Sequence, residues 1–312
     1  MILPNRYNFR SRPRRKITPG RILLVLIAAA IIAGGIIAWR GRVFQRVISP
    51  DETETSLEEL WARQSYEELN ERCEELLVDK PLNLEALVFN GFSYFYRGIA
   101  QFALEARIPL FDRAVVNLRK ALIHKTPRYA SEIHYVLGKS YHYKGKFYAD
   151  LTITYLIESV ALGYVREDTY EYLGLAYSTV GEYAKSAEYF EKAVDQDPTD
   201  MRYLALAQAY VNAGNLETAA EYLLRTVNKT EDVAVEQKSR FLLGQIYMDI
   251  DQLPKAQTQY EKILVINPRS ADAHYFLGEI YRIYGKTIEA RAEWRKALVI
   301  DPSHYGARLR YY

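Results

Sequence analysis

The sequence has a single cysteine, Cys73, which excludes an intramolecular disulfide and a cysteine-based metal site. Its five histidines form no HxxxH or HExxH pair, and it contains no GxGxxG or P-loop phosphate motif and no GxSxG nucleophile turn. These absences remove the common signatures of metalloenzymes, nucleotide-binding enzymes and serine hydrolases. We therefore expect neither catalysis, nor a metal, nor a cofactor.

Acidic residues are missing from positions 1–49, which carry ten of the 41 basic residues of this 312-residue chain. The rest of the chain therefore holds 31 basic against 39 acidic groups, a net charge of about −8. Binding to a phosphate backbone requires clustered positive charge. The charge distribution thus predicts that nucleic acid is not the main partner.

Charge is also absent from Ile22–Trp39, ILLVLIAAAIIAGGIIAW. Eighteen residues at the rise of an α-helix span about 27 Å, close to the thickness of a bilayer core. Seven Arg or Lys residues precede the segment and three follow it, so the positive-inside rule places residues 1–21 in the cytoplasm. We predict an uncleaved transmembrane helix at 22–39, followed by a linker at 40–55. A cleaved signal peptide is the alternative, although the small residues lie in the middle of the apolar run.

The remaining sequence repeats with a period of 34 residues, which separates three residue pairs: Gly244 and Gly278, Tyr247 and Tyr281, Pro268 and Pro302. Without a gap, LLGQIYMDIDQLPKAQTQYEKILVINP (242–268) aligns with FLGEIYRIYGKTIEARAEWRKALVIDP (276–302). The same pattern returns in YLGLAYSTVGEYAKSAEYFEKAVDQDP (172–198). Periods of this length indicate a stack of structural repeats.

The pattern resembles that of the tetratricopeptide repeat family over about 80% of the chain. It has a large residue before Leu-Gly, a Tyr three positions later, a turn residue, an aromatic residue between alanines and a closing Pro. The resemblance implies an all-α, right-handed α-solenoid of about seven helix pairs at 56–304, with a short C-terminal end at 305–312. The expected repeats are 50–83, 84–130, 131–166, 167–199, 200–236, 237–270 and 271–304.

Within each pair, the small residue after Leu is expected to let the two helices approach closely, with the aromatic residue in the core. Four glycines are expected in left-handed turns between paired helices: Gly145, Gly181, Gly214 and Gly285. Two segments depart from the period. Ile99–Phe111 holds a surplus of 13 apolar-rich residues, which predicts lengthened helices that cover one end of the stack, or alternatively an exposed apolar ledge. The segment 228–236, NKTEDVAVE, predicts a solvated loop.

The resemblance also implies that the first helices of successive pairs line a groove that accepts a peptide or a partner helix. It places the following residues in that groove: Phe92, Phe95, Tyr96, Lys139, His142, Tyr143, Glu171, Leu175, Gln208, Asn212, Phe241, Gln245, Met248, Tyr275, Glu279 and Arg282. The family's carboxylate-clamp type uses Lys, Asn and Arg at these positions. Here they are mostly aromatic, acidic or amide residues, which disfavours that type.

Together these expectations predict a protein-binding scaffold or adaptor, and not an enzyme, anchored in a bacterial inner membrane with its repeats in the periplasm. Its role would be that of a part or assembly factor of an envelope complex, such as a secretion or translocation accessory, an envelope biogenesis factor or a flagellar motor component. Two alternatives stay open. One is an anchored receptor that faces the cytosol, which the charge bias opposes. The other is an envelope enzyme with an unrecognised site, which would need a clustered acid pair or a nucleophile–base pair.

Overall fold

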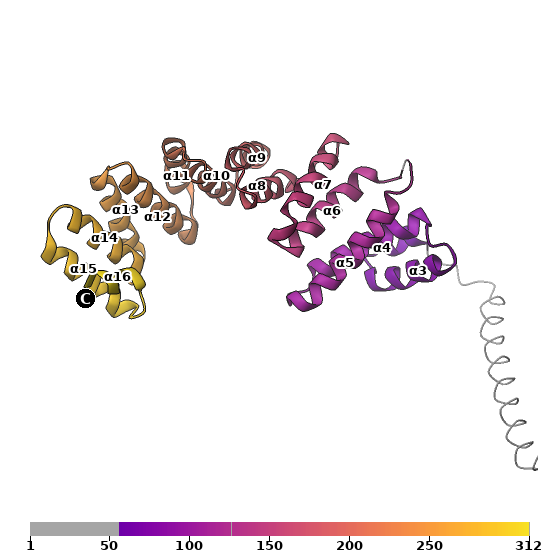
Figure 1. Cartoon of the computed structure of the whole chain (residues 1–312), viewed down its shortest axis with the longest axis horizontal. Coiled ribbons are helices and arrows are strands. Elements are labelled where there is room, and N and C mark those ends of the chain that lie inside the picture. The colour runs from indigo at the N-terminus through magenta and orange to yellow at the C-terminus, as the bar shows by residue number, and fades with distance from the viewer. Residues whose placement is uncertain (1–55, 126, 312) are drawn as a thin grey trace, which may run out of the picture. The chain divides into compact units, whose positions relative to one another are not determined.

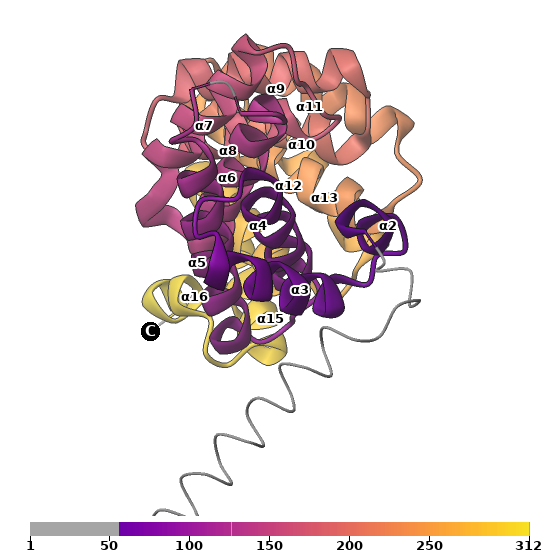
Figure 2. The ribbon, with the colours of Figure 1, turned by 90° about the vertical axis from the view of Figure 1, so that its right-hand side faces the viewer.

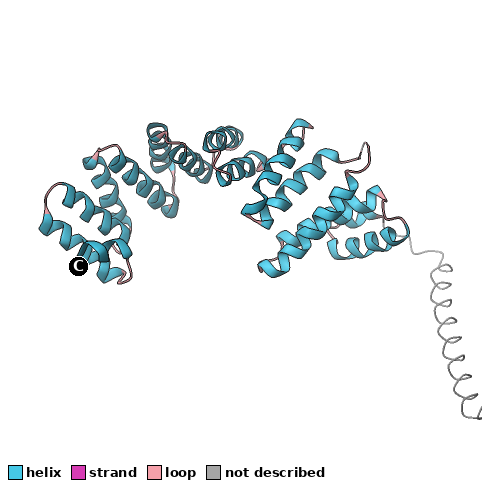
Figure 3. Ribbon diagram, viewed as in Figure 1, coloured by secondary structure: helices cyan, strands magenta, loops and turns pink. Residues whose placement is uncertain are grey.

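The computed structural model of the protein describes residues 56–125 and 127–311, and the regular elements within these ranges are all helices (Figure 3). The expected all-α fold is therefore confirmed for this part of the chain. The predicted cytoplasmic tail, transmembrane helix and linker (1–21, 22–39 and 40–55) lie outside the described residues. Among the helices that are described, none is both long and apolar enough to cross a bilayer.

The helices form consecutive pairs, each joined by a short turn and followed by the next pair (Figure 1). The pairs are α2 (Leu57–Ala62) with α3 (Tyr66–Asp79), α4 (Leu84–Ile99) with α5 (Leu104–Ala121), α6 (Ala130–Lys144) with α7 (Ala149–Ala161), α8 (Thr169–Thr179) with α9 (Tyr183–Gln196), α10 (Asp200–Asn212) with α11 (Leu216–Lys229), α12 (Val233–Asp249) with α13 (Leu253–Ile266), and α14 (Ala271–Ile283) with α15 (Thr287–Ile300). A short 3-10 helix (Lys146–Tyr148) precedes α7, and α16 (Tyr305–Tyr311) follows the last pair.

Each second helix packs against its own first helix and against the first helix of the next pair. Figure 2 turns the molecule so that the N-terminal helices α2, α3 and α4 face the viewer. Contacts between neighbours in the chain order are those of a solenoid, in which each repeat buries its apolar faces against the adjacent repeats.

The Leu-Gly positions allow the two helices of a pair to pack closely, as expected. A Cβ atom added to Gly244 would lie 2.5 Å from Cζ of Tyr260, and one added to Gly278 would lie 2.4 Å from Nε1 of Trp294. Tyr260 is fully buried and Trp294 is buried. The aromatic side chain of the second helix therefore occupies the space that the absent glycine side chain leaves free.

The four turn glycines adopt positive φ angles of 117°, 81°, 81° and 76° in chain order, which confirms their expected left-handed turns. In the sixth pair the equivalent turn residue is Asp251, with a φ of 59°. A side chain with a Cβ atom is disfavoured in this conformation. This turn therefore contains local strain that the glycine turns avoid.

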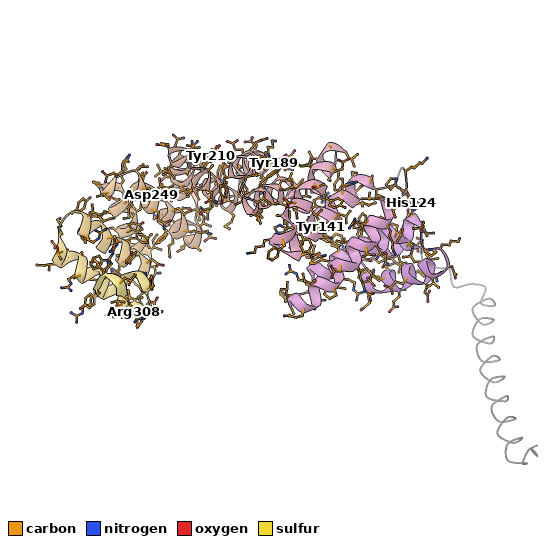
Figure 4. The ribbon with its side chains drawn as sticks, viewed as in Figure 1. His124, Tyr141, Tyr189, Tyr210, Asp249 and Arg308 are labelled. Atoms are coloured by element: carbon orange, nitrogen blue, oxygen red, sulfur yellow. The ribbon has the colours of Figure 1, made fainter. Side chains whose placement is uncertain are left out.

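Stacked tyrosines join the two helices of three consecutive pairs, and Figure 4 labels one ring of each stack. The ring centroids lie 5.5 Å apart in Tyr141–Tyr155, 5.3 Å apart in Tyr177–Tyr189 and 5.7 Å apart in Tyr210–Tyr222. Offset stacking adds to the burial of such rings, and the hydroxyl can still reach a polar partner. The hydroxyl of Tyr210, for example, donates a hydrogen bond to Glu191. This packing accounts for part of the unusual content of 27 tyrosines.

The surplus segment Ile99–Phe111 lengthens two helices, since α4 has 16 residues and α5 has 18. Its end is buried, because Phe111 packs against Phe95 with the ring centroids 5.9 Å apart. Its beginning is exposed, because Phe102 in the turn is fully accessible and Leu104 is 59% exposed. The segment thus combines lengthened helices with an exposed apolar tip.

The prediction of a solvated loop at 228–236 is wrong. Helix α11 continues to Lys229 and α12 already begins at Val233. The side chain of Asp232 caps α12 by accepting hydrogen bonds from the backbone N–H groups of Ala234 and Val235, at 2.8 and 3.2 Å. Val235 is buried. The polar composition of this segment indicated a loop, although Asp232 caps a helix there and Val235 packs that helix into the core.

Candidate partner-binding groove

All sixteen residues predicted to line the groove lie on first helices, namely α4, α6, α8, α10, α12 and α14. First helices also contact the first helix of the next pair at α2–α4, α4–α6, α6–α8 and α10–α12. We call the surface of these helices the first-helix row. Within the described ranges, His, Cys, Asp and Glu side chains form no group that could hold a metal ion.

On α4, two of the three predicted residues are core residues. Phe95 is 1% exposed and Phe92 is 8% exposed, with the Phe92 ring 5.8 Å from Trp61. Tyr96 is 40% exposed and stacks on Tyr66, with ring centroids 5.4 Å apart. Of these three side chains, Tyr96 is the one that offers surface to a partner.

On α6, Lys139 is buried and its charge is compensated. Its Nζ lies 2.7 Å from Oδ2 of Asp168, and the hydroxyl of Tyr135 donates to Oδ1 of the same carboxylate at 2.7 Å. The ammonium group also lies 4.8 Å from the ring centroid of Tyr172. Burial, and then the hydrogen bond to Asp168, raises the pKa of Tyr135 far above its ordinary value. Lys139 therefore holds α6 against the start of α8 and is not free to bind a ligand.

His142 and Tyr143 continue this aromatic cluster. The Tyr143 and Tyr172 hydroxyls share a hydrogen bond of 2.6 Å, and the His142 ring meets Tyr172 edge-on at 4.7 Å. The guanidinium of Arg107 lies 5.3 Å from the centroid of the Tyr143 ring. Burial lowers the pKa of His142, and the charges of Lys139 and Arg107 lower it further, because all three disfavour the charged imidazolium.

Between α8 and α10, the first-helix row contains a hollow of about 180 Å³. Its lining residues are Leu175, Ser178, Phe190, Met201, Leu204, Ala205, Gln208, Ala209, Asn212 and Lys238. Three of the predicted residues, Leu175, Gln208 and Asn212, thus meet at one concave site. The amide of Gln208 donates to Oδ1 of Asn212 at 3.1 Å, so the two form one polar rim.

Glu171, on α8, is already engaged in an ion pair. Its Oε2 lies 3.3 Å from Nε of Arg202 on α10. The same guanidinium also pairs with Asp197 at 2.5 Å and donates to the backbone oxygen of Glu167 at 3.0 Å. Arg202 therefore joins the fourth and fifth pairs and holds Glu171, the acid predicted to line the groove, in an ion pair that it shares with Asp197.

On α12, the predicted residues take part in packing. The ring of Phe241 meets Phe276 edge-on at 5.3 Å, and the hydroxyl of Tyr260 approaches Sδ of Met248 at 3.8 Å. Gln245 is half-buried. The row thus has a packed section next to the open hollow.

On α14, the last predicted residues are covered in part by α16. Glu279 is 6% exposed and lies between Arg282, at 3.1 Å, and Arg310 of α16, at 3.0 Å. The ring of Tyr275 lies 5.0 Å from that of His304, just before α16. Arg282 remains exposed. Helix α16 therefore occupies this end of the row and shields Glu279.

Among the lining residues of the hollow that were not predicted, Met201 and Lys238 are the two that are exposed. Lys238 precedes the predicted Phe241 and Gln245 by three and seven positions, so it shares their helix face. It was missed because residues up to 236 were interpreted as a loop, whereas α12 begins one turn earlier. Met201 precedes Gln208 by seven positions and shares its face in the same way.

Comparison with known proteins gives a consistent picture of the fold. Family models described as tetratricopeptide repeat match residues 167–200 and 241–305. The C-terminal part of a TPR repeat-containing protein from Cytophaga hutchinsonii has a TM-score of 0.61 and 17% identity, over 82% of this chain and 98% of that chain. A crystal structure of MamA protein has a TM-score of 0.50 and 23% identity, over 56% of this chain and 93% of that chain. No curated protein sequence matches the chain. At these identities, the two likenesses indicate a common fold.

Proposed function

Because the chain is a tetratricopeptide repeat protein, we propose that it is a membrane-anchored scaffold that binds protein partners along its first-helix row. Repeats of this kind typically serve as protein-interaction scaffolds and not as enzymes. The observation that carries the proposal is the hollow between α8 and α10. It brings Leu175, Gln208 and Asn212 together at a concave, largely apolar site, which is the form that ligand sites in proteins usually take.

Site-specific photocrosslinking in cells tests the binding surface. A photoreactive residue replaces Gln208 at the hollow, and a matched variant carries it at Glu221, an exposed position on the second helix α11. We expect discrete adducts from position 208 and none from position 221. Equal adducts at both positions, or adducts from position 221 alone, would place the binding surface elsewhere.

The proposal extends to location. We propose that residues 22–39 anchor the chain in a bacterial inner membrane, with residues 1–21 in the cytoplasm and the repeats in the periplasm. The support is the uncharged 18-residue run with basic residues concentrated before it. The partner would then belong to an envelope complex concerned with secretion, envelope assembly or a membrane machine.

Protease accessibility in spheroplasts tests this topology. External protease should digest the repeats in intact spheroplasts and leave an epitope on the N-terminal tail protected until the membrane is lysed. Protection of the repeats and digestion of the tail would instead support the anchored receptor that faces the cytosol.

A further inference from the structure

The hollow between α8 and α10 has apolar walls and an accessible mouth. Phe190, Leu204 and Ala209 are buried in its walls, whereas Leu175 is 38% exposed and Met201 is 61% exposed at its edge. An apolar cavity of about 150 Å³ is large enough to hold a benzene-sized group. At about 180 Å³, the hollow therefore fits one apolar side chain of a bound segment.

Lys238 is the charged residue in the lining of this hollow. It is exposed and, among the residues that the structure describes, no carboxylate lies within ion-pair distance of its ammonium group. The polar neighbours Gln208 and Asn212 satisfy each other in part through their own hydrogen bond. The free charge at the hollow is thus positive.

Nearby acids on α8 and α12 are engaged in ion pairs within the protein. Glu171 pairs with Arg202 at 3.3 Å, and Glu236, two positions before Lys238, pairs with Arg240 at 2.6 Å. The Arg202 guanidinium also pairs with Asp197 at 2.5 Å. A basic partner would therefore meet carboxylates that already have a cationic partner, and a lysine that has no acidic one. An acidic partner would meet the free ammonium group in the lining of the hollow.

We propose that this hollow binds an acidic segment of a partner protein, with one apolar side chain inside the hollow and a carboxylate next to it against Lys238. This inference rests on the proposed protein-binding function and adds the chemistry of the partner. Burial of the apolar side chain stabilises the complex but does not orient the bound segment. The ion pair with Lys238 at the rim orients the segment and favours acidic sequences.

Selection from a displayed library of random peptides tests the inference. The probe is the purified full chain in mild detergent, and the recovered peptides are sequenced. We expect enrichment of Asp or Glu within three positions of Leu, Ile, Met or Phe. Recovery of binders that are basic, or apolar without acids, would overturn the inference and leave the protein-binding function standing. Recovery of no binder would count against both.

Three variants, tested with the selected peptides, separate charge from shape. Lys238→Glu should weaken binding by about tenfold, because the substitution replaces an attraction with a repulsion. Lys262→Glu makes the same charge change at an exposed lysine on the second helix of the same repeat and should leave binding unchanged. Ala205→Phe fills the hollow and should abolish binding with its melting curve retained.

Salt supplies a readout that a purely structural role of Lys238 would not affect. Affinity of the wild-type chain should fall as salt rises, and the Lys238→Ala variant should lose most of that dependence. Equal effects of Lys238→Glu and Lys262→Glu, or an unchanged salt dependence in Lys238→Ala, would refute the contact between Lys238 and the acid.

Discussion

The close contact between Gly244 and Tyr260 predicts that a single methyl group destabilises the sixth repeat. In Gly244→Ala the new Cβ would lie 2.5 Å from Cζ of Tyr260 and less than 3 Å from both Cε atoms. The ring cannot move aside, because it is fully buried, stacks on Phe276 at 5.2 Å and meets Phe241 at 5.8 Å. Overpacking of this kind costs about 1–3 kcal/mol, and the higher helix propensity of Ala returns about 1 kcal/mol. Because the ring cannot move, the cost should lie in the upper part of that range, about 2–3 kcal/mol, which leaves a net loss of about 1–2 kcal/mol in the free energy of unfolding.

The fifth repeat suggests the compensating change. There the same two positions hold Ala207 and Leu223, and both side chains are fully buried. Tyr260→Leu alone should cost about 2–3 kcal/mol, because it leaves space in the core. The double variant Gly244→Ala, Tyr260→Leu recreates the arrangement of the fifth repeat. Its loss in the free energy of unfolding should be smaller than the sum of the two single-variant losses by about 1–2 kcal/mol.

The assay is equilibrium urea unfolding of the four chains, followed by far-ultraviolet circular dichroism. Ala207→Gly serves as the reverse control, and its expected loss is about 1 kcal/mol from helix propensity alone. The reasoning would be refuted if Gly244→Ala were as stable as the wild type. Strict additivity of the two substitutions would refute it as well, because the contact would then carry no energy.

Three further predictions concern the turn, the thiol and the imidazole. Asp251→Gly should raise the free energy of unfolding by about 0.5–1 kcal/mol, and with it the urea midpoint, because Gly adopts the left-handed backbone of this turn without strain. A lower midpoint would show that the Asp side chain stabilises the turn. Burial raises the pKa of the Cys73 thiol to about 12. Thiol reagents at pH 8 should therefore label Cys73 only in denaturant, and rapid labelling of Cys73 in the folded protein would contradict this prediction. Because the folded pKa of His142 lies below the unfolded value of about 6.5, the unfolded state takes up the proton first and stability should fall as pH drops below that value. His142→Gln should therefore lose less stability than the wild type between pH 7 and pH 5, and equal losses would exclude this role.

The sequence predicted the helix pairs and their internal packing well, because each repeat must meet the same geometric demand. A glycine at position 244 and a large ring at position 260 are complementary in volume, and a 34-residue period repeats that relation along the chain. Turn glycines follow from the left-handed backbone that ends a first helix. Local demands of this kind can be deduced from residue type and spacing alone.

Exposure along the groove could not be deduced in this way. Helical periodicity places Phe95 and Tyr96 on one helix next to each other, but only the neighbouring helices determine that Phe95 is 1% exposed and Tyr96 40%. The start of α12 was misplaced because NKTEDVAVE is polar in composition, and a single capping contact from Asp232 decides its structure. Lys238 was overlooked for the same reason.

The charge of the proposed binding surface shows most clearly why composition is insufficient. The chain after residue 49 is acidic by a net charge of about −8, which by itself would favour a basic partner. Ion pairing reverses that expectation locally, since Arg202 pairs with Glu171 and Arg310 pairs with Glu279, while Lys238 has no acidic partner among the described residues. Exposed charges farther apart than about 8–10 Å are screened from one another at physiological salt. A bound segment therefore responds to the unpaired groups within its own contact area, and at the hollow that group is an ammonium.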